Sequence, residues 1–154
     1  VGIIAAARRR RRGARVGRRL LDRLPDGISW HDIEILTSEP DEHSAVLTIR
    51  GASRIVTFED LCMRDGRGRG PSKRWTLLKT LGRARGRIPR LFRPDAPQHD
   101  ELVECVRQDL RIAFGLEGDP IPLVRDGGRR RAWQCRFQVE SAWAGDADAT
   151  NLGE

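Results

Sequence analysis

The residues that most often perform catalysis are few in this chain and stand far apart. The three histidines are His31, His43 and His99, each isolated among unrelated polar residues, and no Ser/His/Asp or Cys/His arrangement appears. A base or a nucleophile works only when a partner orients and activates it. We therefore expect that this protein is not an enzyme, uses no cofactor and takes no small-molecule substrate.

The cysteines are equally dispersed. Cys62, Cys105 and Cys135 have no second cysteine or histidine at the spacing of zinc ligands, and three is an odd number for a disulfide framework. We expect buried, reduced thiols in a cytoplasmic protein. The apolar start "VGIIAAA" is too short for a membrane span, and its charges follow rather than precede it. We therefore expect neither a signal peptide nor a membrane partner.

Two further patterns could hold a cation or a phosphate. Asp100, Glu101, Glu104 and Asp109 lie along one predicted helix, and "GRGRG" at 66–70 is rich in glycine. A phosphate-binding loop has the form GxxxxGK[ST] between a strand and a helix, and this stretch lacks that context. Ordinary solvated acids and a flexible linker explain the two patterns, and we expect no metal site.

The basic residues are unevenly distributed along the chain. Residues 1–19 carry eight arginines and no acid, and residues 64–93 carry eleven basic residues and one acid, whereas 20–63 and 94–110 are acidic. Such segregation indicates a partner of opposite charge, such as nucleic acid. Two alternatives stay open. The arginines could reflect a GC-rich bacterial genome and form only a solvated surface, or residues 1–19 could be a flexible segment without a role.

Hydrophobic periodicity predicts a mixed fold between two polar ends. A short helix over 16–24 is stopped by the turn residues Pro25-Asp26-Gly27. Three β-branched runs within 28–58 are joined by tight polar turns, which predicts an antiparallel meander. The stretch "CMRDGRGRG" at 62–70 cannot bury anything and is predicted to be a loop.

A first amphipathic helix is predicted to open at Pro71-Ser72 and to end at Gly86, a natural C-terminal cap. Its apolar stripe recurs at three- and four-residue steps. The stripe consists of Trp75, Leu78 and Leu81. We expect these three side chains in the core.

The second helix, over 96–114, has the strongest pattern in the chain, and Asp95 and Gln98 before it are spaced as a capping box. Asp126-Gly127-Gly128 then predicts the turn of a C-terminal hairpin. Residues 141–154 are predicted to be a disordered acidic tail. The large aromatic side chains expected in the core are Trp30, Trp75, Trp133 and Phe137.

This order of elements resembles the OmpR/PhoB-type winged helix-turn-helix effector domain over about residues 28–140. "SKRWTLLKTLGRARGRI" is similar to the family's first helix, "DELVECVRQDL" to its recognition helix and "DGGRRRAWQCRFQV" to its wing. The resemblance implies an α+β fold, a winged helix with a small N-terminal antiparallel sheet and a C-terminal β-hairpin wing. Residues 1–27 are then a basic N-terminal segment with a short helix.

The resemblance implies a transcription regulator that binds double-stranded DNA. Arginine and lysine of 64–90 would follow the phosphates, the second helix would enter the major groove, and the wing arginines would reach the minor groove. The expected nucleic-acid-binding residues are Lys73, Arg74, Gln98, Arg107, Arg111, Arg129, Arg130 and Arg131.

The chain departs from the family in two places. Between Ile88 and Asp95 there is too little chain for the family's full second helix, and four acids on the 96–114 helix repel phosphate. The alternative function is therefore a protein-interaction or scaffolding winged helix that does not bind DNA. RNA binding would require exposed aromatic residues on a sheet, whereas the aromatic residues here are expected in the core.

Overall fold

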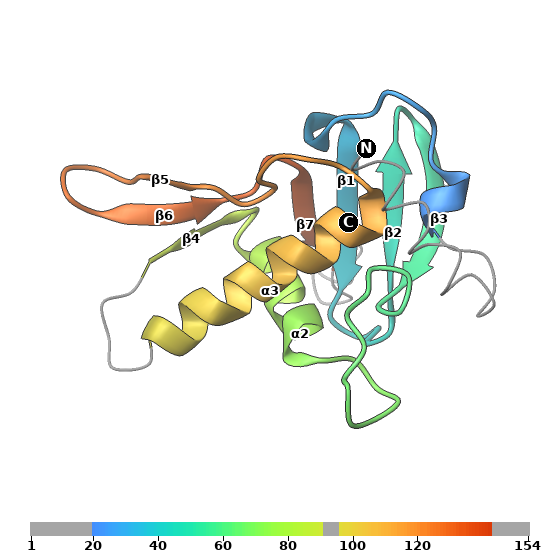
Figure 1. Ribbon diagram of the computed structural model, residues 1–154, viewed down its shortest axis with the longest axis horizontal. Coiled ribbons are helices and arrows are strands. Elements are labelled where there is room, and N and C mark those ends of the chain that lie inside the picture. The colour runs from blue at the N-terminus through green and yellow to red at the C-terminus, as the bar shows by residue number, and fades with distance from the viewer. Residues whose placement is uncertain (1–19, 91–95, 143–154) are drawn as a thin grey trace, which may run out of the picture.

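A computed structural model describes residues 20–90 and 96–142 of the chain (Figure 1). The described part of the N-terminal half contains two single-turn 3-10 helices, η1 (Leu20–Arg23) and η2 (Trp30–Asp32), and three strands. The described part of the second half contains two α-helices and four short strands. In order along the chain, the remaining elements are β1 (Ile33–Ser38), β2 (Ser44–Ile49), β3 (Ala52–Thr57), α2 (Lys73–Arg83), β4 (Arg87–Pro89), α3 (Ala96–Phe114), β5 (Leu123–Arg125), β6 (Arg131–Gln134) and β7 (Gln138–Ala142).

The expected meander is confirmed, and a fourth strand joins it. β1, β2 and β3 pair antiparallel, and β7 pairs parallel with β1, which gives the order β3-β2-β1-β7. The turn between β2 and β3 has positive φ angles at Arg50 (51°) and Gly51 (85°), the geometry that suits a two-residue hairpin. The sequence pattern did not predict the parallel pairing of β7, whose partner lies about a hundred residues away.

Alternation along the strands separates two faces of this sheet. Ile33, Ile35 and Thr37 of β1 are buried, whereas Glu34 and Leu36 are exposed. We call the buried side the inner face; α2 packs against its strands β1 and β7, and α3 packs against α2 (Figure 1). We call the opposite side the outer face.

The two amphipathic helices have the predicted positions. α2 begins after Ser72 and stops where Arg85 and Gly86 take positive φ angles of 55° and 84°. Its stripe is buried as expected, and so are the large aromatic residues expected in the core. Their exposed fractions are 1% for Trp75, 5% for Trp30, 7% for Trp133 and 3% for Phe137.

A second, three-stranded sheet carries the expected hairpin. β4, β6 and β5 pair antiparallel in that order, and Gly127 and Gly128 form the turn with φ angles of 79° and 56°. Figure 1 shows β5 and β6 projecting to the left, away from the four-stranded sheet. Trp133 on β6 pairs with Ile88 on one side and Leu123 on the other, which anchors the hairpin at its base.

The protein is therefore an α+β fold, as the sequence predicts. The described part of the expected 16–24 helix is only the 3-10 turn η1, and the proposed capping box of Asp95 and Gln98 lies outside the described side chains. β7 continues through Ala142, two residues into the expected tail, and the remaining tail residues, 143–154, and the basic segment 1–19 also lie outside the described residues. Among the described helices, none has the length and hydropathy needed to cross a bilayer.

The expectation of buried thiols holds for only one cysteine. Cys135 is buried, and burial raises the pKa of its thiol to about 12. Cys62 is half-buried and Cys105 is exposed. Cys105 departs from the expectation because it shares the solvent side of α3 with Glu101 and Gln108.

Candidate nucleic-acid interface

Four arginines are concentrated at the end of the β5–β6 hairpin. Arg125 ends β5, Arg129 and Arg130 lie in the turn, and Arg131 begins β6, and all four are exposed. We call these four residues the arginine tip. Arg125 and Arg131 are direct cross-strand neighbours. Like charges directly opposite each other destabilise a strand pair.

Asp126, the acidic residue next to Arg125 of the tip, forms an ion pair with Arg87. Arg87 on β4 donates to Asp126 Oδ1 at 2.7 Å and to Gln134 Oε1 at 2.9 Å, which fastens β4 across the hairpin. The backbone closes the turn, because Asp126 N–H donates to Arg130 O at 2.9 Å and Arg130 N–H to Gly127 O at 3.0 Å. Within the described residues, no carboxylate forms an ion pair with the arginine tip.

A second basic surface lies at a different end of the molecule. We call residues 64–72 the basic loop; its arginines Arg64, Arg67 and Arg69 are exposed, and so is Lys73 immediately after it. The loop has internal order, since Arg64 and Pro71 form an isolated bridge and Asp65 N–H donates to Gly70 O at 3.0 Å. In Figure 1 this loop projects at the bottom of the view, between α2 and the four-stranded sheet, far from the arginine tip.

Arg74 lies between the basic loop and the helix interface. Its Nη2 donates to Arg64 O at 2.8 Å and its Nε to Ser72 Oγ at 3.2 Å. The same Nε lies 3.0 Å from Asp109 Oδ2 on α3. Arg74 is therefore engaged inside the protein, with 28% of its side chain exposed.

Asp109 corrects one interpretation of the sequence, which grouped it with three other acids as solvated. Asp109 is only 7% exposed, because it faces α2. Burial raises the pKa of its carboxyl to about 7, although the Arg74 charge works in the opposite direction. Asp100 also has a partner, because Arg90 Nη2 donates to its Oδ2 at 2.9 Å.

The arginines of α3 also contact the protein rather than open solvent. Arg107 donates to both carboxylate oxygens of Asp119, at 2.9 and 2.6 Å, and lies 2.7 Å from Glu104 Oε2. Arg111 Nε donates to Gly118 O at 2.9 Å. Both side chains fix the segment that follows α3. To reach a DNA groove, each would have to break these contacts.

The predicted site residues therefore separate into two groups. The tip residues Arg129, Arg130 and Arg131 lie together and are open to solvent, and Lys73 is exposed beside the basic loop. Arg74, Arg107 and Arg111 are engaged, and Gln98 lies in the first turn of α3, where side chains are outside the described part. The exposed face of α3 is acidic and apolar, comprising Glu101, Glu104, Cys105, Gln108 and Ile112.

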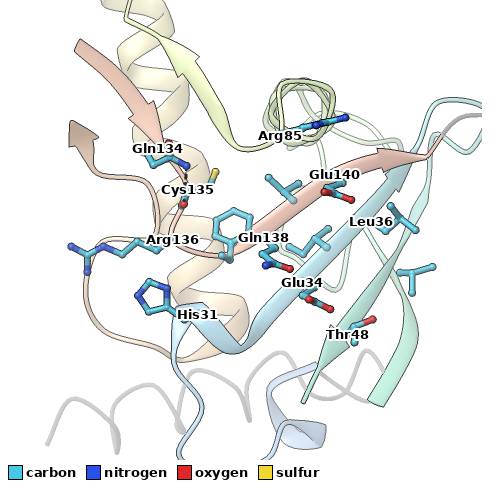
Figure 2. Close-up of a pocket in the computed structure, with 14 residues that line it drawn as sticks. His31, Glu34, Leu36, Thr48, Arg85, Gln134, Cys135, Arg136, Gln138 and Glu140 are labelled. Atoms are coloured by element: carbon cyan, nitrogen blue, oxygen red, sulfur yellow. Dashed lines mark hydrogen bonds between the residues drawn. The ribbon is translucent and has the colours of Figure 1, made fainter. Parts of the chain in front are cut away.

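The structure also contains a groove on the outer face that the sequence pattern did not reveal. Its volume is about 730 Å³, and β1, β2 and β7 form its floor (Figure 2). Glu34, Gln138 and Glu140 lie along this floor, and Arg136 extends away from it. The alternation of β1 marks Glu34 as exposed, but the groove needs β7 beside β1, which local sequence does not encode.

Comparison with protein-family models, with curated proteins and with solved structures finds no match to this chain. The functional assignment therefore depends on the geometry of these two basic surfaces.

Proposed function

We propose that this protein binds duplex DNA through its phosphates, with the arginine tip as the main contact. The observation that carries the proposal is the direct opposition of Arg125 and Arg131 at the end of a projecting hairpin, beside Arg129 and Arg130. A hairpin that served only as a solvated surface would gain nothing from this repulsion. Phosphates would neutralise it and release their condensed counterions.

The shape of the hairpin supports contact with a groove edge. Arginine presents a planar fork of donors that matches phosphate oxygens, and the narrow minor groove attracts inserted arginine side chains. A turn of two glycines keeps the tip slender, because neither residue carries a side chain. The proposed role agrees with the wing of the family that the sequence resembles.

The second contact in this proposal is the basic loop with Lys73. Its arginines are exposed and would hold the phosphate backbone at a separate point of the duplex. The described face of α3, residues 99–114, presents Glu101 and Glu104 to solvent, and carboxylates repel phosphate. We therefore propose that affinity comes from the two basic surfaces and that residues 99–114 supply little base recognition.

The test measures the affinity of the full chain for a random-sequence duplex by fluorescence anisotropy at low salt. The variant Arg129→Gln/Arg130→Gln should weaken binding at least about tenfold, which corresponds to roughly 1.4 kcal/mol. The matched control Arg54→Gln/Arg136→Gln removes the same charge from β3 and from the base of the hairpin, and should cost less than about threefold.

Equal losses in the two double variants would mean that overall charge, not the arginine tip, drives the binding. No binding by the full chain at low salt would reject the DNA function itself.

A second candidate function, a protein-interaction module, is favoured by the outer face. Leu36, Val46 and Ile55 are direct neighbours across β1, β2 and β3, and Ile55 is 71% exposed on the edge strand. An exposed edge strand can pair with an extended segment of a partner. The full chain would then capture a protein that the Ile55→Glu variant does not, and neither chain would bind duplex DNA.

A further inference from the structure

The contact between Asp109 and Arg74 is a buried ion pair with incomplete hydrogen bonding. Asp109 Oδ2 lies 3.0 Å from Arg74 Nε, yet this oxygen is buried and accepts no hydrogen bond from any described residue. The Nε–H is directed at Ser72 Oγ instead. Burial of an ionised carboxylate costs desolvation free energy. Without hydrogen-bond donors, the attraction of the neighbouring charge offsets only part of that cost. The fold therefore stabilises the ionised form of Asp109 only weakly relative to its protonated form.

Within the described residues, Arg74 is the charged group that lowers the pKa of Asp109 against the effect of burial. The neighbours of Asp109 one turn away on α3 are Cys105 and Ala113, neither of which is an acidic or a basic residue. From α2 it faces Arg74, and η1, which also packs against α3, carries Asp22 and Arg23 on its exposed side. Arg74 is thus the charged group that decides whether Asp109 stays ionised.

The Arg74 guanidinium group could take an alternative orientation, toward the basic loop. Its Nη2 already bonds the backbone of Arg64, at the base of the basic loop, and part of its side chain is open to solvent. A rotation of the guanidinium group away from Asp109 would add a fourth arginine to Arg64, Arg67 and Arg69. The same residue can therefore serve either the helix interface or the phosphate-binding surface.

We propose that Arg74 is a proton-controlled phosphate contact, held inward by ionised Asp109 and released toward DNA when Asp109 takes up a proton. The inference rests on the proposed function and adds its regulation. The proton comes from the buffer and is bound by the Asp109 carboxyl. Arg74 stays charged in both states and exchanges a carboxylate partner for a phosphate.

Linkage fixes the direction of the effect. Because burial raises the pKa of Asp109 to about 7, both protonation states are populated near neutral pH. A phosphate that draws Arg74 outward removes the charge that favours ionised Asp109, so DNA binding raises this pKa further and takes up protons. By reciprocity, lowering the pH strengthens DNA binding.

The test is isothermal titration calorimetry of the full chain with a random 20-base-pair duplex at pH 7.5, in HEPES and in Tris. The difference in heat between the two buffers gives the protons taken up. If the contact raises the Asp109 pKa by about one, the wild type should take up about half a proton more than Asp109→Asn. Asp119→Asn, another carboxylate in an ion pair, should keep the wild-type uptake. The three histidines are unchanged in all these chains, so their contribution cancels in the difference.

A second variant tests the role of Arg74. Arg74→Gln should weaken DNA binding at pH 6 but hardly at pH 8, and the wild-type affinity should be about fivefold higher at pH 6 than at pH 8 relative to Asp109→Asn. Equal proton uptake by the wild type and Asp109→Asn, or an equal loss in Arg74→Gln at both pH values, would overturn the switch and leave the DNA function intact. Absence of any binding would reject both proposals.

Discussion

Gly82 is a point of close approach between α2 and the four-stranded sheet. A Cβ at this position would lie 2.6 Å from Thr37 Oγ1 and 3.1 Å from Glu140 O. The Thr37 hydroxyl donates to that same carbonyl at 3.2 Å, so one small region joins α2, β1 and β7. A glycine is required here by the close approach of the helix to backbone, which cannot move aside.

Gly82→Ala should therefore lower the free energy of unfolding by about 1–3 kcal/mol, through overpacking against β7. Urea denaturation of the two chains measures the difference. Gly66→Ala is the matched control, because a Cβ there meets nothing within 4 Å, and it should leave the midpoint almost unchanged. Equal midpoints for Gly82→Ala and the wild type would mean that the helix does not pack as closely as described.

Asp109 gives the protein a pH dependence whose sign is fixed. Its ordinary pKa is 3.8 and its folded pKa is about 7, so the folded protein retains a proton that the unfolded chain releases. This contribution to stability is complete below pH 4 and is lost as the pH rises through 7. Between pH 5 and pH 8 the wild type should lose about 2–3 kcal/mol more than Asp109→Asn. Denaturation at the two pH values measures it, and parallel curves for the two chains would contradict the buried carboxyl.

Among the elements, α3 forms an ion pair with the segment that follows it, which leads to β5. Arg107 holds Asp119 with two hydrogen bonds, and Asp119 Oδ1 also accepts from Ile121 N–H at 2.9 Å. This arrangement orders the connection from α3 to β5 and so fixes the base of the hairpin. These contacts position the hairpin that carries the arginine tip, but they include none of its four arginines.

Asp119→Asn should lower stability by about 1–2 kcal/mol, because the pair is partly exposed and its charge attraction is screened. DNA affinity measured well below the unfolding transition should stay within about twofold, since Asp119 and Arg107 lie outside the arginine tip and the basic loop. A large loss of affinity in a folded Asp119→Asn chain would place α3 at the DNA after all.

Elements that depend on local sequence could be predicted, whereas pairings between distant residues could not. The 96–114 helix and the hairpin turn depend on local periodicity and on glycines, so the sequence predicted both. The pairing of β7 with β1 depends on contacts between residues about a hundred positions apart, such as Ile35 with Val139, and local pattern carries no such information. The sequence predicted three residues of the arginine tip, Arg129, Arg130 and Arg131, as part of the candidate site. It could not predict that Arg107 and Asp109 turn inward.

Across the molecule, the described residues present two basic surfaces, the arginine tip and the basic loop, and one acidic surface, the exposed face of α3. The arginine tip projects from one side and the basic loop from another (Figure 1). The sequence established the segregation of charge, whereas only the fold establishes which charges remain open to a partner. A winged-helix arrangement stays a proposal that is compatible with the order of these elements.

Phosphate binding by the hairpin is measured by the slope of log affinity against log salt for a random-sequence duplex, because each phosphate neutralised contributes about −0.9 to that slope. The arginine tip should account for part of that slope, so Arg129→Gln/Arg130→Gln should flatten it by about 1.8 relative to the wild type. Arg54→Gln/Arg136→Gln should leave it nearly unchanged. Identical slopes for all three chains would contradict phosphate binding by the hairpin.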